Sequence, residues 1–471
     1  MMHGADGKTL VLSALSAQAA AQNNFEAVVA SAPARLDVSG GMAVYAGGVV
    51  AQSSFSLRAT AGVAPRADGS LWMADCTMPF TQAAQIAFDM QAVLSGALEP
   101  PITNNACEPP AWAKLILTTV LEFNRVAATP TAAALRRGLS ISVHNPIDAG
   151  RSPASASAMA AALVQCLCLH FEISAGVIEK AHLIASIQRS LRGGRSHAVD
   201  ALTVLCAHDG PPTHLLRYRS QPHELLGQIP LSHELQLLAI EIEQTNAAAP
   251  STAESVLTAG AMGAQIIETI YRDLGHEPAG RPFYLGNISP GLYKRYFRAL
   301  LPRRLRGRDF TRTYGPLPQD SIEADYVYHV RAAVDHLIGE SEYAENFLQA
   351  MEELAPNSDE RTPGAARRVN AQRAGRLLLA SQHSYRLRLG LSSPAADWLI
   401  ARLTDTQVVH CAYGARVTDM GDGGLVVALL PHTAGATDHL LGVISDYGRH
   451  FGSAARVYRA GEKHCGGTLL G

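Results

Sequence analysis

The stretch that decides the fold is Ser-Ala-Pro-Ala-Arg-Leu-Asp-Val-Ser-Gly-Gly-Met-Ala-Val-Tyr-Ala-Gly-Gly, residues 31–48. It follows an apolar run, Phe25–Ala30, that predicts a strand. Arg35 and Asp37 are two positions apart, so in an extended strand both side chains point to one face. The Gly-Gly pairs allow a close approach of the backbone to a ligand. These features suit a site for an anionic or polyhydroxylated ligand, but spacing alone is equally typical of a turn between two strands with a surface Arg.

The length indicates two or three domains or two closely packed lobes, and the composition indicates a globular protein. The chain has 471 residues, of which 47% are hydrophobic and 6% aromatic. Its net charge is −2 and only 17% of its residues are charged. This balance argues against a non-specific nucleic-acid surface or a polybasic membrane surface.

The cysteines and the N-terminus give an expectation about the compartment. The seven cysteines include no CxxC pair and no metal-ligand spacing, which favours a reducing cytoplasm. Residues 1–24 are expected to form a flexible N-terminal arm or a short helix, and not a signal peptide. No segment approaches the roughly 18 consecutive apolar residues of a membrane span.

Hydrophobic periodicity predicts the main elements along the chain. Strands are expected at Val49–Leu57 and Leu139–Val143, with strand-like segments in 213–242. Helices are expected at 111–126, Ser155–His170, 177–191, 252–274, 289–300, 342–354 and 364–404, the last with a break near Gly390–Pro394.

Two further segments carry candidate functional residues. A loop of small residues, 144–153, leads from a predicted strand into a helix, where free backbone N–H groups and the helix dipole favour an anion. The alternative is an ordinary Ser-capped helix. There is no Walker A motif, which argues against a standard P-loop. Asp200 begins an apolar run, either as a helix cap or as part of a site beside that loop.

The opening stretch resembles the first motif of the GHMP sugar kinases, and within that family it is most similar to the branch of L-arabinokinase and galactokinase. Residues 146–160 are similar to the second motif, Pro-x-Gly-x-Gly-Leu/Val-Ser-Ser-Ser-Ala, which cradles the nucleotide phosphates. Asp148 stands where that motif has its first Gly. Ala154 or Ser155 stands where a Ser would help to hold Mg²⁺.

Three later segments resemble the same family. Residues 188–200 are similar to Glu-x-x-x-x-Gly-x-x-x-Gly-x-Met-Asp, so Asp200 falls on the catalytic Asp. Residues 381–397 are similar to a late signature of the branch. Residues 413–424 resemble the third motif, a glycine turn that closes over the active site, although Asp419 and Met420 replace two of its glycines.

The resemblance implies an α+β, two-lobed GHMP kinase fold. Its N-terminal lobe, similar to domain 2 of ribosomal protein S5, would span residues 25–220. Its ferredoxin-like C-terminal lobe would span residues 221–471.

The resemblance also implies ATP-dependent phosphorylation, with Mg²⁺, of the anomeric hydroxyl of a sugar or sugar-like molecule. The implied catalytic residues are Asp200 and Arg35. The implied substrate-binding residues are Asp37, Gly41, Met42, Val44 and Tyr45. The implied nucleotide-binding residues are Gly150, Arg151, Ser152, Ser155, Gly421, Gly423 and Gly424, with Ser155 also as a metal ligand.

The sugar-binding positions depart from the family. Gly41, Met42 and Val44 stand where galactokinases carry Glu, His and Asp, and Ala247, Ala253 and Leu257 replace His, Tyr and Arg. Each buried hydroxyl left without a partner costs about 1–3 kcal/mol. The sugar pocket is therefore rebuilt or abandoned. The alternative function is a catalytically inactive kinase-like sensor or partner protein. In either case we expect a small-molecule ligand, no nucleic acid, no membrane, and a monomer or homodimer.

Overall fold

A computed structural model describes residues 6–19, 26–77, 84–96, 109–147, 153–192, 196–206, 214–243, 250–275, 283–317, 322–356, 364–419 and 424–459. This part of the chain divides into two compact units, residues 6–35 with 54–206 and residues 36–53 with 214–459. Residues 36–53 belong to the second unit, although the sequence placed them in the N-terminal lobe.

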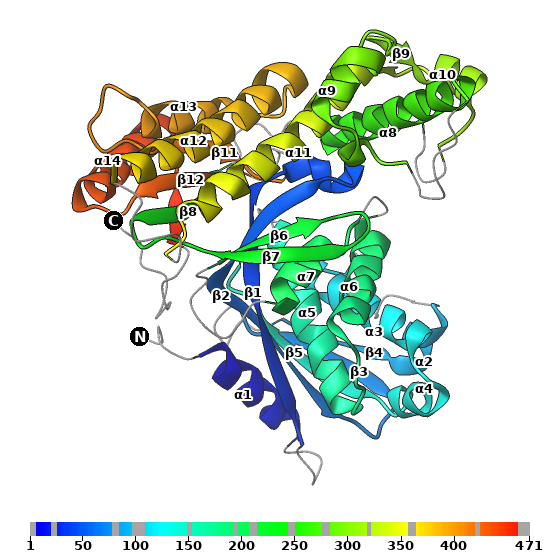
Figure 1. Cartoon of the computed structure of the whole chain (residues 1–471). Coiled ribbons are helices and arrows are strands. Elements are labelled where there is room, and N and C mark those ends of the chain that lie inside the picture. Colours follow the sequence, from blue (N-terminus) through cyan, green and yellow to red (C-terminus); the bar gives the residue numbers. More distant parts are fainter. Residues whose placement is uncertain are drawn as a thin grey trace. The chain divides into compact units, whose positions relative to one another are not determined.

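The first unit is a sheet with a group of helices that pack on one another (Figure 1). Its strand order is β4 (Ala84–Asp89), β3 (Ser70–Asp75), β5 (Leu139–His144) and β2 (Val49–Pro65). The strands β3 and β5 are parallel, and the other neighbours are antiparallel. The helices are α2 (Met90–Ser95), α3 (Ala111–Val126), α4 (Thr129–Leu135), α5 (Pro153–His170), α6 (Val177–Arg192) and α7 (Val199–Cys206). The predicted strand near Leu139 and the predicted helices in this unit are confirmed.

The N-terminal residues form a helix, α1 (Gly7–Ala19), so the helical alternative is the one observed. Val11 and Leu15 are fully buried and join a hydrophobic cluster with Trp72. Gly62 of β2 leaves room for them, since a Cβ at this position would lie 2.4 Å from Val11 Cγ1. A glycine in the strand thus lets α1 pack directly on the sheet.

The strand β1 (Val28–Ser39) continues well beyond Ala30, where the sequence predicted its end. Leu36 and Val38 are buried, and so are the charged side chains that alternate with them. Because both faces of this part of the strand are buried, polar side chains within it do not mark the point where the strand leaves the core. A buried 3-10 helix, η1 (Gly41–Ala46), then takes the place of the predicted turn.

The second unit holds an antiparallel sheet with helices packed on it (Figure 1). Its strand order is β11 (Gly414–Val417), β12 (Leu425–Pro431), β8 (Leu235–Glu241) and β13 (Arg456–Arg459). The strand β6 (His214–Arg219) pairs with residues 49–52 of β2 and with β7 (Glu224–Pro230). The other elements are α8 (Pro250–Asp273), η3 (Leu285–Asn287), α9 (Pro290–Leu292), β9 (Leu305–Arg306), α10 (Gly307–Tyr314), β10 (Val327–Tyr328), α11 (Val330–Glu352), α12 (Gly364–His383), α13 (Pro394–Leu403), α14 (Ala434–Phe451) and the π-helical segments Tyr293–Phe297 and Ser384–Leu389.

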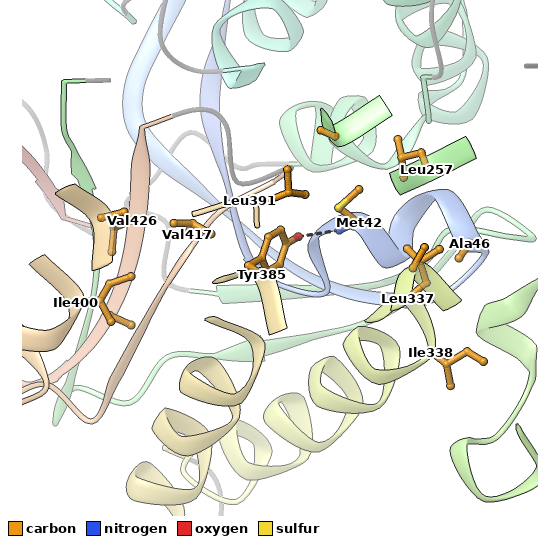
Figure 2. Close-up of a cluster of buried hydrophobic side chains, with 14 of the residues drawn as sticks. Met42, Ala46, Leu257, Leu337, Ile338, Tyr385, Leu391, Ile400, Val417 and Val426 are labelled. Carbon is orange, nitrogen blue, oxygen red and sulfur yellow. Dashed lines mark hydrogen bonds between the residues drawn. The ribbon is translucent and has the colours of Figure 1, made fainter. Parts of the chain in front are cut away.

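The core of this unit encloses the 3-10 helix η1. Figure 2 shows Met42 and Ala46 of η1 among side chains from other elements, including Leu257, Leu337 and Tyr385. The backbone N–H of Met42 donates a hydrogen bond to the Tyr385 hydroxyl, at 3.2 Å. The segment after β1 is therefore held by both apolar packing and a buried polar contact.

The backbone of α12 lies directly against the backbone at the start of β11. This close packing predicts that a larger residue at Gly375 destabilises the fold. A Cβ at the buried Gly375 would lie 2.0 Å from the carbonyl oxygen of Tyr413. We expect Gly375→Ala to lower the free energy of unfolding by about 1–3 kcal/mol, because the helix must move off the strand. Urea unfolding would measure this. As a control, Gly442→Ala places a Cβ in open space on α14, and a similar loss in that variant would contradict the packing argument.

Among the described residues, no helix is both long enough and apolar enough to cross a membrane.

Candidate active site

The first unit brings together the two residues that the sequence analysis paired. Arg35 Nη2 donates a hydrogen bond to Asp200 Oδ2 at 2.7 Å, although 165 positions separate them. Arg35 comes from β1 and Asp200 from α7. They are only 3% and 7% exposed. The predicted proximity is observed, and the pair is a buried ion pair.

The position of Asp200 in α7 explains its charge environment. Asp200 is the second residue of the helix and lies in its first turn. A carboxylate in the first turn is stabilised by the helix dipole. It also accepts the hydrogen bond from Arg35.

His197 is a neighbour of this pair that sequence reasoning missed. Its Nε2 lies 3.9 Å from Asp200 Oδ2, and its side chain is 11% exposed. The available signal was its position three residues before Asp200, although His197 itself precedes α7, which begins at Val199. In the same unit, Gln188 Nε2 donates a hydrogen bond to Ser157 Oγ at 2.6 Å and so ties α6 to α5.

Several predicted site residues lie outside the described part of the chain, or their side chains do. These are Gly150, Arg151, Ser152, Gly421, Gly423 and the side chain of Ser155. Gly424 is described, with a φ of +63°, and its carbonyl accepts a hydrogen bond from the Ile242 N–H at 2.7 Å. Ala253 and Leu257 are buried in the hydrophobic core of the second unit.

Asp37, predicted to bind substrate, instead contacts groups of its own unit. Its Oδ2 accepts hydrogen bonds from Arg416 Nη2 at 2.5 Å and from the Asp419 N–H at 3.0 Å. Its Oδ1 accepts from the Gly41 N–H at 3.3 Å. Asp37 is 2% exposed. Both carboxylate oxygens are therefore engaged by the protein.

Arg416 is the centre of this cluster, and the sequence analysis did not single it out. Its side chain is fully buried on β11, and its Nη1 lies 3.2 Å from Glu340 Oε2 and 3.3 Å from Ser381 Oγ. Its Nε donates to the Val417 carbonyl at 2.8 Å. Burial acts to lower the pKa of Arg416, but the neighbouring charges, led by Asp37, outweigh burial and raise it. Arg416 therefore carries a permanent positive charge inside the unit.

Glu340 makes the stability of the protein depend on pH. Burial raises the pKa of its carboxyl above the usual 4.5. The folded protein therefore binds this proton more tightly than the unfolded chain does. The resulting stabilisation is complete below the unfolded pKa and is lost as the pH rises through the folded pKa.

Glu340→Gln should remove this dependence, since the amide does not titrate. We expect the free energy of unfolding of the variant, relative to the natural protein, to rise as the pH increases from about 4.5 to 8. Urea unfolding at a series of pH values would measure it. Glu345→Gln changes an exposed carboxylate on the same helix and is the control. Parallel pH curves for Glu340→Gln and the natural protein would contradict the assignment.

The remaining predicted substrate contacts lie in or against the core. Met42 is fully buried and Val44 is 6% exposed. Tyr45 is partly buried and packs on the same hydrophobic cluster. Met42 is thus a core residue in the structure, and we do not propose it as a substrate contact.

Comparison with known proteins gives the class of this fold. No protein-family model matches the chain. The galactokinase of Lactococcus lactis, solved with galactose, matches with a TM-score of 0.71 at 16% identity and covers 96% of this chain and 98% of its own. The mevalonate kinase of Methanococcus jannaschii matches with a TM-score of 0.54 at 10% identity and covers 93% and 98%. The chain therefore has the two-lobed α+β fold of the GHMP kinases.

A protein with a similar sequence indicates which branch of these kinases the chain resembles. The chain is 23% identical over 480 aligned positions to the L-arabinokinase of Arabidopsis thaliana. The match covers 90% of this chain and 44% of that protein, so the chain spans less than half of its relative. The resemblance to the branch of L-arabinokinase and galactokinase is confirmed.

Proposed function

We propose that this chain transfers a phosphoryl group from ATP to the anomeric hydroxyl of a sugar or sugar-like molecule. The observation that carries the proposal is the buried ion pair of Arg35 and Asp200. Kinases with this fold supply the reaction class, since the neighbours named above phosphorylate small molecules. A monomer or homodimer in the cytoplasm is part of the proposal.

The two residues have complementary roles in this mechanism. Phosphoryl transfer depends mainly on positioning and on neutralising charge. The carboxylate of Asp200 would orient the acceptor hydroxyl and accept its proton. The guanidinium of Arg35 would hold that carboxylate and balance negative charge in the transition state. Because only 9% of the Asp200 side chain is exposed, little water screens these charges.

The nucleotide phosphates would bind at the loop before α5. Gly150, Arg151 and Ser152 precede the helix that begins at Pro153, whose dipole favours phosphate. Gly421, Gly423 and Gly424 are the further nucleotide-binding residues that the resemblance implies. Among the described residues no group of three or more His, Cys, Asp or Glu side chains could hold a metal. That fits Mg²⁺ bound mainly by phosphate and water, with an oxygen such as that of Ser155 as protein ligand.

The acceptor would differ from galactose at its polar contacts. Asp37 is committed to Arg416, and Val44 offers only an apolar surface. The proposed substrate contacts are therefore Gly41, Val44 and Tyr45. They suit a sugar-like molecule with a less polar face, such as a modified sugar or a cyclitol.

The alternative is a kinase-like sensor or partner protein that binds without turnover. It is favoured by Asp148 and Asp419, which stand where the family motifs have glycine. Asp419 nevertheless has a φ of +52°, the left-handed backbone that glycine adopts most easily. Asp419 thus adopts a backbone conformation that is typical of glycine, despite the substitution.

One assay separates the two functions. The purified protein would be incubated with ATP, Mg²⁺ and a panel of sugars and cyclitols, with phosphorylated product detected by mass spectrometry. A thermal-shift titration with ATP and Mg²⁺ would run in parallel. Product from any acceptor supports the kinase. Binding without product across the panel supports the sensor, and neither binding nor product overturns both.

A further inference from the structure

We propose that one face of the second unit binds an anionic lipid surface. Residues 290–308 form this face, which we call the basic face; they run from α9 through β9 to the start of α10. Figure 1 shows these three elements together at one end of the second unit. The proposal is independent of the kinase reaction, because no residue of the basic face belongs to the proposed active site.

The basic face carries a local excess of positive charge. Residues 290–308 contain seven Lys or Arg residues and no Asp or Glu, whereas the whole chain has a net charge of −2. The balance of the whole chain, which argued against a polybasic membrane surface, therefore conceals a strongly basic segment.

Most of these cations are not used in ion pairs. Arg298 lies 2.9 Å from Asp335, and Arg308 lies 2.9 Å from Asp325. The other five are exposed and form no ion pair with any residue that the structure describes: Lys294, Arg295, Arg303, Arg304 and Arg306. These five side chains can therefore meet an external anion without breaking a described ion pair.

An apolar stripe lies on the same segment. Residues 290–301 comprise α9, the π-helical segment Tyr293–Phe297 and the turn after it. One set of side chains, four positions apart, is buried in the core of the unit: Tyr293, Phe297 and Leu301. A second set, each one position earlier, is 37%, 51% and 59% exposed: Leu292, Tyr296 and Leu300. Since residues four apart lie on one side of a helix, the second set forms an apolar stripe in solvent.

Cationic and apolar side chains are neighbours on this face. The guanidinium carbon of Arg295 lies 5.2 Å from the centre of the Tyr296 ring. On the adjoining hairpin, the exposed Val327 of β10 lies directly opposite Arg306 of β9. Side chains that are directly opposite in an antiparallel pair lie on the same face. The positive charge and the exposed apolar surface are therefore interspersed.

This combination matches the chemistry of an anionic lipid surface. Segments that lie in a membrane interface bury Leu and aromatic side chains at the headgroup boundary, and their Lys and Arg side chains contact anionic headgroups. Clusters of about four to eight Lys or Arg on such a segment are typical of phosphatidylserine-binding surfaces. A protein interface normally seats its aromatic anchors in fitted pockets. An open row of cations with apolar side chains between them favours lipid over a protein partner.

Co-sedimentation with vesicles would test the natural protein. We expect it to bind vesicles of phosphatidylcholine with about 30% phosphatidylserine, and to bind phosphatidylcholine alone at least about tenfold more weakly. Binding should weaken as salt is raised from about 0.05 to 0.5 M, because salt screens surface charge. No binding at low salt, or equal binding to the two vesicles, overturns the proposal.

A charge variant tests where the lipid binds. Each cation near an anionic leaflet contributes about 1 kcal/mol, or about fivefold in affinity. We therefore expect about 100-fold weaker binding when three cations are removed together: Arg303→Gln, Arg304→Gln and Arg306→Gln. The matched control removes three exposed arginines from α12 and α13: Arg368→Gln, Arg376→Gln and Arg402→Gln. Equal losses in the two variants would show that net charge, and not the basic face, governs binding.

A second variant tests the apolar stripe. Tyr296→Ser combined with Leu300→Ser keeps every cation and should weaken binding about tenfold, since less apolar surface enters the interface. Undiminished binding by this variant, with an unchanged melting temperature, contradicts the part of the stripe. Binding of a poly-glutamate peptide without binding of vesicles would assign the face to an acidic protein and overturn the lipid proposal. The phosphorylation assay should give the same result for the charge variant and the natural protein, so the two proposals fail separately.

Discussion

Asp200→Asn is expected to lower kcat for phosphoryl transfer by about 10²–10⁴-fold, the usual contribution of a positioned general base. The amide can still accept a hydrogen bond from Arg35, but it cannot take a proton from the acceptor hydroxyl. Steady-state kinetics with the best acceptor of the panel would measure the loss. Undiminished turnover by the variant would show that the reaction does not use Asp200.

The same substitution also affects stability, and its control must account for this. Removing one charge of a buried ion pair typically costs about 3–5 kcal/mol, because the other charge is left unpaired. The kinetics should therefore be measured well below the unfolding midpoint of the variant. Glu122→Gln is the matched control, since Glu122 is a buried carboxylate of the same unit that accepts hydrogen bonds from Ser186 and Ser190. It should lose stability and keep its activity.

Arg416→Met is expected to lower the free energy of unfolding by about 3–5 kcal/mol. It leaves Asp37 and Glu340 buried without their shared positive partner. This is a large part of the roughly 5–15 kcal/mol that stabilises a typical protein. Urea unfolding at neutral pH would measure it. Arg312→Met, which breaks an exposed pair with Asp309, should cost at most about 1 kcal/mol.

A triple variant tests the cause of this loss. Combining Arg416→Met with Asp37→Asn and Glu340→Gln removes the unpaired charges, so part of the stability should return. A triple variant no more stable than Arg416→Met alone would show that lost packing, and not buried charge, causes the effect.

Much of the local structure could be predicted from the sequence. The helix α3 was found from its hydrophobic periodicity, because it buries one stripe of side chains. The strand β5 was found from its alternation of apolar and polar residues, although the structure buries both of its faces. The end of β1 was predicted at Ala30, nine residues before its actual end at Ser39. The polar residues after Ala30 suggested the end of the strand. In a strand that is buried on both faces, polar and apolar residues need not follow the usual alternation, so polar residues do not mark its end. The order of the motifs gave the fold, and the solved neighbours confirm it.

The sequence by itself determined helices such as α3 and strands such as β5, the resemblance, and the pairing of Arg35 with Asp200 as an implied catalytic couple. Only the tertiary structure decided what Asp37 does. Its spacing from Arg35 suggested a shared ligand, whereas its partner is Arg416, 379 positions away. Local spacing fixes the face of a strand on which a side chain lies. The atoms that meet that side chain come from distant segments, and folding alone brings those segments together.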